Sequence, residues 1–120
     1  MASAKRWLQG PVPASSPFFL WVHYYDPHAP YEPPGALADR FRAAPYDGEI
    51  AFVDTQLARL LGALESAGAL ARTIVLATAD HGESLGEHGE GTHGLFVYDA
   101  TLKVPWIIAG PGVAAGRRSA

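Results

Sequence analysis

Residues 73–83 read TIVLATADHGE, an apolar and β-branched run followed at once by a carboxylate, an imidazole and a glycine. The run from Thr73 to Thr78 predicts a buried β-strand. Asp80 and His81 would then lie just past the carboxyl end of that strand, where open α/β sheets bind their ligands. This stretch therefore predicts both a sheet and the edge of that sheet at which a site would form.

The residues before this stretch predict a strand and a helix. Phe18–Tyr25 is apolar or aromatic and lies between Pro17 and Pro27, which predicts a strand buried on both faces. Asp47 is the expected N-cap of a helix and Gly68 its stop. Apolar residues recur between them at three- and four-residue steps: Ile50, Val53, Leu57, Leu60, Leu61 and Leu64. The order strand, helix, strand predicts a right-handed βαβ unit with parallel strands.

The rest of the chain is assigned from its composition. Residues 104–109 predict a further strand, and the prolines of residues 26–44 predict a long loop. Residues 80–94 are too rich in glycine and glutamate to form core. We therefore expect an irregular lead-in over residues 1–16 and, over residues 17–120, an α/β arrangement of a βαβ unit and one further strand.

Composition excludes several classes of protein. The 120 residues carry a formal charge of −3 without clusters, so neither a nucleic-acid partner nor a polybasic membrane patch is expected. The absence of cysteine excludes disulfides, thiolate zinc sites and a cysteine nucleophile within this stretch. The N-terminal basic pair is not followed by an apolar run, so we expect no signal peptide in this chain. Its longest apolar run, residues 18–22, is far shorter than the roughly 20 residues that cross a bilayer.

Asp80 and His81 are candidate metal ligands. A carboxylate and an imidazole can converge on one cation if the backbone turns, and Gly82 permits such a turn. The alternative is an aspartate that caps a loop at the end of a strand, next to an exposed histidine.

Two further histidines are candidates for anion binding or proton transfer. His28 lies between Pro27 and Pro30, which restrict the backbone of the loop that holds it. The alternative for His28 is an incidental surface histidine in a proline-rich turn. His93 precedes an apolar segment that returns toward the core, so it is a better candidate than His88.

The remaining polar residues have simpler interpretations. His23 lies within the predicted buried strand and is expected to be a core histidine. The acidic residues of the glycine-rich loop are expected to be mostly solvated. Ser84 lacks the strand-turn-helix context of a nucleophile, so no nucleophile is evident.

The chemistry of the set Asp80, His81, His28 and His93 suits the transfer of a charged ester group. A divalent cation polarises the oxyanion of an ester, and histidines bind its other oxygens or protonate the leaving alkoxide. This combination predicts sulfuryl or phosphoryl transfer.

Four motifs resemble the sulfatase family of the alkaline phosphatase superfamily, in order and at similar intervals. They are DPHAPY at residues 26–31, YDGEIAFVD at 46–54, DHGE at 80–83 with the later His93-Gly94, and Val104-Pro105. The resemblance extends over about residues 17–112. It implies an alkaline-phosphatase-like fold, with a mixed, mainly parallel sheet flanked by helices, of which residues 17–120 are only a part. It also implies an enzyme that hydrolyses small-molecule or carbohydrate sulfate esters.

The resemblance also implies roles for individual residues. Asp80 would be a metal ligand and His81 would occupy the neighbouring ligand position, with Ca²⁺ as the usual metal. His28 would contact the sulfate and protonate the leaving oxygen. His93 stands where the family has a lysine or histidine that binds the ester group.

The family's other metal ligands and its C-x-P-S-R or S-x-P-S-R nucleophile segment precede the matching region and do not occur in this chain. We therefore expect the isolated chain to be inactive, whether it is a fragment or a natural truncation. Exposed sheet edges would favour self-association. Family members are often exported, and this chain does not indicate a compartment.

Two alternatives stay open. One is a phosphoethanolamine transferase or a phosphonate or phosphodiester hydrolase of the same superfamily, with Zn²⁺ or Mn²⁺, because imidazole ligands suit those metals better than Ca²⁺. The other is a noncatalytic fragment that binds metal weakly or serves as a scaffold.

Overall fold

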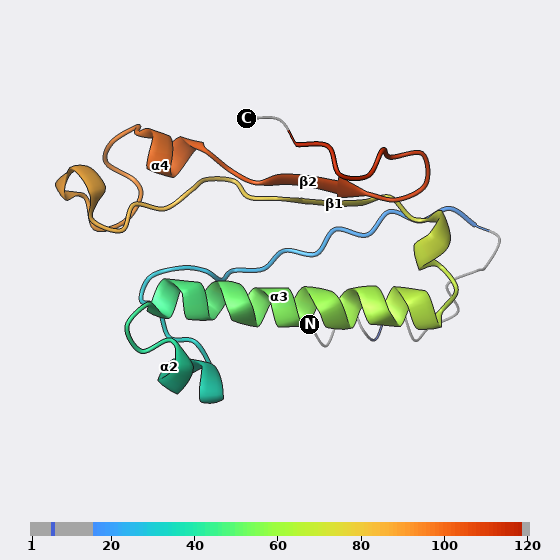
Figure 1. Cartoon of the computed structure of the whole chain (residues 1–120), viewed down its shortest axis with the longest axis horizontal. Helices are drawn as coiled ribbons and strands as arrows, with labels where there is room; N and C mark the ends of the chain where they lie inside the picture. Colours follow the sequence, from blue (N-terminus) through green and yellow to red (C-terminus); the bar gives the residue numbers. More distant parts are fainter. Residues whose placement is uncertain (1–5, 7–15, 119–120) are drawn as a thin grey trace. The chain divides into compact units, whose positions relative to one another are not determined.

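The computed structural model of the chain describes Arg6 and residues 16–118 (Figure 1). The chain divides into two compact units, Met1–Leu70 and Ala71–Ala120, and each is described by itself. Apart from Arg6 and Ser16, the predicted irregular lead-in over residues 1–16 lies outside the described residues.

The main element of the first unit is the helix α3, Pro45–Ser66. Pro45 occupies the start of the helix, where its fixed φ is favourable and its missing N–H costs nothing. The N-cap is Ala44, so the prediction of Asp47 as N-cap was wrong. Asp47 instead lies in the first turn, where a carboxylate interacts favourably with the positive end of the helix dipole.

The C-terminus of α3 confirms the predicted stop at Gly68. Gly68 has a φ of 65°, the left-handed conformation that glycine adopts most easily. Its N–H donates to the carbonyl of Glu65 at 2.8 Å, and the N–H of Ala69 donates to the carbonyl of Leu64 at 2.9 Å. This pair of bonds is the Schellman motif, and it places the buried Ala69 beside the last turn of the helix.

An extended segment, residues 18–25, follows the length of α3 (Figure 1). Its side chains alternate between half-buried and exposed, as the period of an extended backbone requires. Phe18, Leu20 and Val22 pack against the core of the unit. That core consists of Leu60, Leu64 and Ala69.

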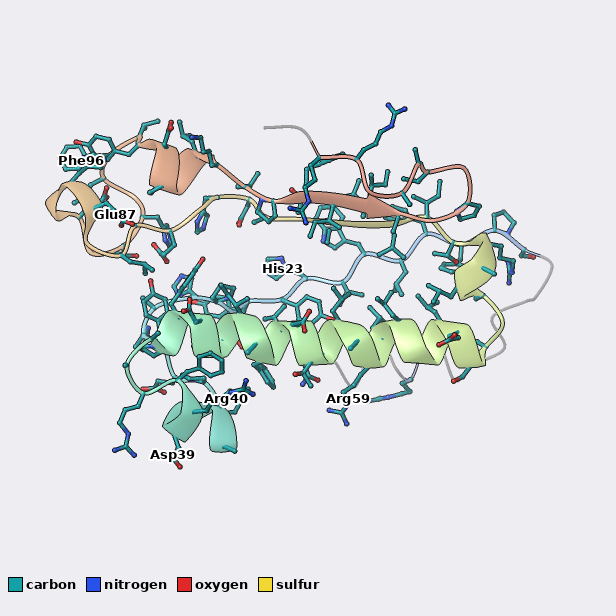
Figure 2. All side chains as sticks on the ribbon, in the orientation of Figure 1. His23, Asp39, Arg40, Arg59, Glu87 and Phe96 are labelled. Carbon is teal, nitrogen blue, oxygen red and sulfur yellow. The ribbon has the colours of Figure 1, made fainter. Side chains whose placement is uncertain are left out.

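The predicted strand buried on both faces was therefore wrong. Residues 18–25 are extended but belong to no strand of the described chain, and their second face is exposed, with Trp21 at 79%. His23 is on this exposed face, so the prediction of a core histidine was also wrong (Figure 2). Packing on α3 accounts for only one of the two apolar faces of the segment.

The proline-rich residues 26–44 form a loop that contains one short helix, α2, Ala36–Arg40. The sequence did not predict this helix. It begins after Gly35, which has a φ of 60°, and follows the last proline of the loop.

The second unit contains the two strands. After the 3₁₀ turn η1, Leu70–Arg72, the strand β1, Val75–Thr78, pairs antiparallel with β2, Trp106–Ala109. Val75 lies opposite Ala109 and Thr78 opposite Trp106. The connection between the strands holds a 3₁₀ turn, η2, Glu87–Gly89, and the short helix α4, Asp99–Leu102.

The mixture of helices and strands agrees with the predicted α/β class, and both β1 and β2 lie within predicted strands. The parallel βαβ pairing is not observed, because the sheet of the described residues contains only β1 and β2. The chain reverses direction between these strands, which makes their pairing antiparallel. Within the described residues, no helix is both long and apolar enough to cross a membrane.

Truncation of Leu64 tests whether the segment on α3 forms the core of the first unit. We expect Leu64→Ala to lower the free energy of unfolding by about 2–5 kcal/mol, because it leaves a cavity beneath Leu20 and Val22. Ile50→Ala is the control on the same helix; Ile50 is 44% exposed, and its truncation should cost less than about 1 kcal/mol. Urea unfolding followed by the circular dichroism of α3 measures both, and equal losses would contradict this core.

Candidate functional site

Asp80 follows β1 with one residue between them, and its side chain is exposed. Its Oδ1 accepts the backbone N–H of His81 at 3.1 Å and lies 3.8 Å from Nε2 of the same histidine. The carboxylate thus accepts a hydrogen bond from the next residue and lies near the imidazole of that residue.

The His81 ring is held by the backbone of the next residue. Its Nδ1 lies 2.7 Å from the carbonyl oxygen of Gly82. Because a carbonyl oxygen can only accept, Nδ1 carries the proton of this contact, which leaves Nε2 as the ring nitrogen outside it. This nitrogen is the one that lies nearest to Asp80.

Gly82 is required by the close approach of α4. Its N–H donates to the carbonyl of Thr101 at 2.8 Å. A Cβ at position 82 would overlap the carbonyl oxygen of Ala100. The glycine of the DHGE motif therefore allows α4 to pack directly against the chain that carries His81.

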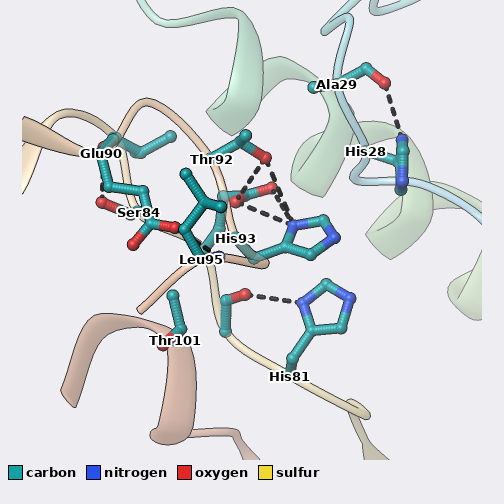
Figure 3. Close-up of polar contacts among 12 residues, drawn as sticks. His28, Ala29, His81, Ser84, Glu90, Thr92, His93, Leu95 and Thr101 are labelled. Carbon is teal, nitrogen blue, oxygen red and sulfur yellow. Dashed lines mark hydrogen bonds and ion pairs between the residues drawn. The ribbon is translucent and has the colours of Figure 1, made fainter. Parts of the chain in front are cut away.

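The carboxylate of Glu83 holds His93. Nδ1 of His93 lies 3.1 Å from Oε1 and 3.3 Å from Oε2 of Glu83, and the hydroxyl of Thr92 donates to Oε1 at 3.2 Å (Figure 3). The Glu83 side chain is only 5% exposed. An ionised carboxylate only accepts hydrogen bonds, so the proton of this pair is on Nδ1.

The structure brings His81 and His93 together. Their ring centroids are 3.9 Å apart and the ring planes are inclined by 31°. Both residues are half-buried. Two imidazoles from positions 12 residues apart thus form one cluster with the Glu83 carboxylate.

A second glutamate orders the loop that carries His93. Glu90 is 5% exposed, and its Oε1 accepts the backbone N–H of Leu95 at 2.8 Å and that of Phe96 at 3.3 Å. Its carbonyl accepts the hydroxyl of the buried Ser84 at 2.7 Å. Ser84 is thus a structural residue of this loop, consistent with the absence of a nucleophile signature around it.

The expectation that the acidic residues of this loop are mostly solvated was wrong for Glu83 and Glu90. It holds for Glu87, which is exposed. Hydrogen bonds from the backbone N–H groups of Glu87 and Leu85 lower the pKa of the Glu87 carboxyl below its usual value.

His88 has a φ of 59° and stacks on Tyr98, with ring centroids 4.1 Å apart.

His28 belongs to the first unit and is held in a similar way. Its Nδ1 donates to the carbonyl of Ala29 at 2.7 Å (Figure 3), and its ring stacks on Tyr25 at 4.4 Å. Its backbone N–H donates to Oε2 of Glu49 at 3.0 Å. All three candidate histidines therefore use Nδ1 for an internal hydrogen bond.

Within Arg6 and residues 16–118, no three His, Cys, Asp or Glu side chains are grouped to hold a metal ion. Asp80 and His81 are thus two adjacent donors that would supply only part of a coordination shell. Their chemistry fits this partial role, because the Nδ1–H of a metal-binding histidine usually donates to a carbonyl or carboxylate, as that of His81 does.

The structure also contains residues that the sequence did not assign to the site. Glu49 and Glu83 are parts of recognised motifs, but composition alone did not show that their carboxylates hold other site residues. Both follow a glycine, Gly48 and Gly82, that permits close backbone packing. The same Gly-Glu pair also occurs at the exposed Glu87, so the sequence held no signal that singles these two glutamates out.

The family model and the relatives of this chain point to the same family. The sequence model of the sulfatase family matches residues 1–120. An arylsulfatase from Clostridium perfringens is 28% identical over 82% of this chain. The human iduronate 2-sulfatase is 37% identical over 72% of the chain, and a choline-sulfatase from Rhizobium meliloti is 35% identical over 59%.

The matching regions make up 28%, 16% and 14% of the lengths of those three relatives. This chain therefore corresponds to a limited part of each of them. The family implies the alkaline-phosphatase-like fold, of which the α/β elements described above are a part. On the extent of the family match and the agreement among these relatives, the chain belongs to the sulfatase family.

Proposed function

We propose that this chain supplies part of the metal and anion site of an enzyme that hydrolyses sulfate esters with the help of a divalent metal. The observation that carries the proposal is the paired His81 and His93 rings beyond β1, each with Nδ1 engaged, in a chain of this family. The relatives are named for aryl, iduronate and choline sulfates. We therefore propose a sulfate monoester as the substrate class and do not select one of these three substrates.

Asp80 and His81 would be the protein donors to the metal in this chain. A bound divalent cation polarises the ester oxygens and stabilises the charge that develops on them. Ca²⁺ takes six to eight oxygen ligands, so most of its coordination would come from groups outside the described residues. The preferred metal of the family, Ca²⁺, is the one we propose here.

His93 and His28 would act on the ester itself. With Nδ1–H on Glu83, a protonated His93 would donate from Nε2 to a sulfate oxygen. With Nδ1–H on the Ala29 carbonyl, a protonated His28 can release the Nε2 proton to the leaving oxygen. The nucleophile of the reaction would lie in the family's C-x-P-S-R or S-x-P-S-R segment, so we propose that the isolated chain is inactive.

A second candidate function is phosphoethanolamine transfer or hydrolysis of phosphonates and phosphodiesters within the same superfamily. The observation that favours it is the cluster of two imidazoles, since imidazole suits Zn²⁺ and Mn²⁺ better than Ca²⁺. The identity of the nucleophile and the preferred ester distinguish the two candidates.

The role of Glu83 is tested by the state of the His93 ring. We expect Glu83→Ala to shift the imidazole ¹⁵N signals of His93 away from those of a ring protonated at Nδ1, because the acceptor at 3.1 Å is removed. Long-range ¹H–¹⁵N spectra of the 120-residue chain measure this change. Glu87→Ala is the control, and His28, held by Ala29, is the internal reference. Unchanged His93 signals in Glu83→Ala would exclude Glu83 as the residue that orients the ring.

The metal role of Asp80 is tested with Mn²⁺ as a paramagnetic probe. We expect Mn²⁺ to broaden the signals of Asp80 and His81 first, with a dissociation constant of about 10⁻⁴–10⁻³ M because few protein donors are present. Asp80→Asn should weaken this broadening severalfold. Asp99→Asn, which changes an exposed carboxylate of the same unit, should leave it unchanged. Equal broadening around Asp99 and Asp80 in the wild-type chain would contradict a specific site.

The reaction itself is tested by reading the coding sequence upstream of Met1 in the same frame. We expect a C-x-P-S-R-like or S-x-P-S-R-like segment there, and metal-dependent hydrolysis of aryl sulfates by the complete product. In that protein, His28→Ala should lower kcat/KM by about 10²–10⁴ through loss of a general acid, and His88→Ala should leave it near the wild-type value. A stop codon without such a segment would remove the catalytic proposal. Activity on phosphodiesters or phosphonates alone would favour the second candidate.

A further inference from the structure

The loop that carries His28 rests on the N-terminal end of α3 through a buried carboxylate. Glu49 is 3% exposed. Its Oε2 accepts the backbone N–H of His28 at 3.0 Å, and its Oε1 accepts that of Glu32 at 2.8 Å. Each oxygen of one side chain thus binds a different peptide group, and the two peptides bracket residues 29–31.

A buried carboxylate needs hydrogen bonds that replace its hydration. Removal of a carboxylate from water costs several kcal/mol unless hydrogen bonds replace its hydration. Bonds from N–H groups to an ionised acceptor are short and about twice as strong as neutral ones. The two loop peptides provide this replacement, so the burial of Glu49 and the conformation of the loop depend on each other.

The neighbours of Glu49 in the YDGEIAFVD motif fit the same loop. A Cβ on Gly48 would lie 2.7 Å from Cγ of Pro33 and 2.9 Å from Cβ of Phe41, so only glycine admits the loop at this distance. The ring of Tyr46 meets that of Tyr31 edge-on, with centroids 5.4 Å apart. The start of α3 is therefore shaped to receive residues 28–33.

The same contact reaches the His28 ring through the backbone. Glu49 fixes the N–H of His28, and the carbonyl of the next residue, Ala29, holds Nδ1 of the ring at 2.7 Å. Rotation of the backbone at His28 would move that carbonyl and the ring together. Stacking on Tyr25 restricts the ring from one face, with an interplanar angle of 27°.

We propose that Glu49 is a positioning residue for His28: its carboxylate holds the loop peptides so that Nε2 of the histidine is directed at the ester. Glu49 binds only the protein backbone in this arrangement and does not touch substrate. The inference rests on the proposed function, because it assumes that His28 acts on the ester. The positioning itself can be measured without activity.

The first test uses the 120-residue chain and amide hydrogen exchange measured by NMR. In Glu49→Ala both acceptors are lost, so we expect the amides of His28 and Glu32 to exchange roughly tenfold faster or more. Amides in the middle of α3 should keep their wild-type rates. Glu65→Gln changes an exposed glutamate on the same helix and should alter neither loop amide.

Glu49→Gln keeps the shape of the side chain and one acceptor oxygen. We expect it to preserve the slow exchange of one loop amide and to lose that of the other, and to leave the helix folded even if Glu49→Ala does not fold. The imidazole ¹⁵N signals of His28 should broaden or shift in both variants. Wild-type exchange at His28 and Glu32 in Glu49→Gln, or an equal acceleration of α3 and loop amides, would overturn the proposal.

The second test uses the complete product of the reading frame. If it hydrolyses sulfate esters, Glu49→Gln should lower kcat severalfold with little change in KM, and Glu65→Gln should leave both unchanged. An inactive wild-type product would count against the proposed function and leave the exchange experiment to decide the role of Glu49. An active product with wild-type kcat in Glu49→Gln would overturn the positioning role alone.

Discussion

The first unit depends on the packing of one apolar edge of an extended segment against the C-terminal half of a single helix. Leu60, Leu64 and Ala69 are the buried apolar residues of the described chain, and every second side chain of residues 18–22 covers them. This contact fixes the direction in which the chain enters the proline-rich loop. The loop then returns to the other end of α3, where hydrogen bonds and close backbone packing hold it.

Polar contacts to the backbone hold the functional loops, and apolar burial contributes little there. Glu49 and Glu90 each use a buried carboxylate to bind two peptide N–H groups, and Glu83 uses one to bind a ring. Loops of this kind have few apolar side chains to bury, so hydrogen bonds to charged acceptors determine their conformation. The conformation of each loop therefore depends on the hydrogen bonds of one carboxylate.

Sequence reasoning identified the helix, its glycine stop and the two paired strands, because hydrophobic period and turn residues are local signals. It misplaced the helix start, because Pro45 at the first helical position outweighs a possible cap at Asp47. It predicted that residues 18–25 are buried on both faces. This was wrong because an apolar run does not show which other elements cover its two faces. The environments of Glu49, Glu83 and Glu90 could not be predicted, since a glutamate that binds backbone has the same sequence signature as a solvated one.

The contact between the His28 loop and the start of α3 has a consequence for protein engineering. Residues 28–33 obtain their conformation from Gly48 and Glu49, so the loop and the N-terminal end of the helix behave as one structural module. A chimeric enzyme with a crossover between residues 34 and 45 would combine a loop from one parent with the supporting carboxylate of another. Crossovers placed before residue 26 or after residue 54 keep the module intact, and designers who exchange substrate pockets among sulfatases can use these boundaries.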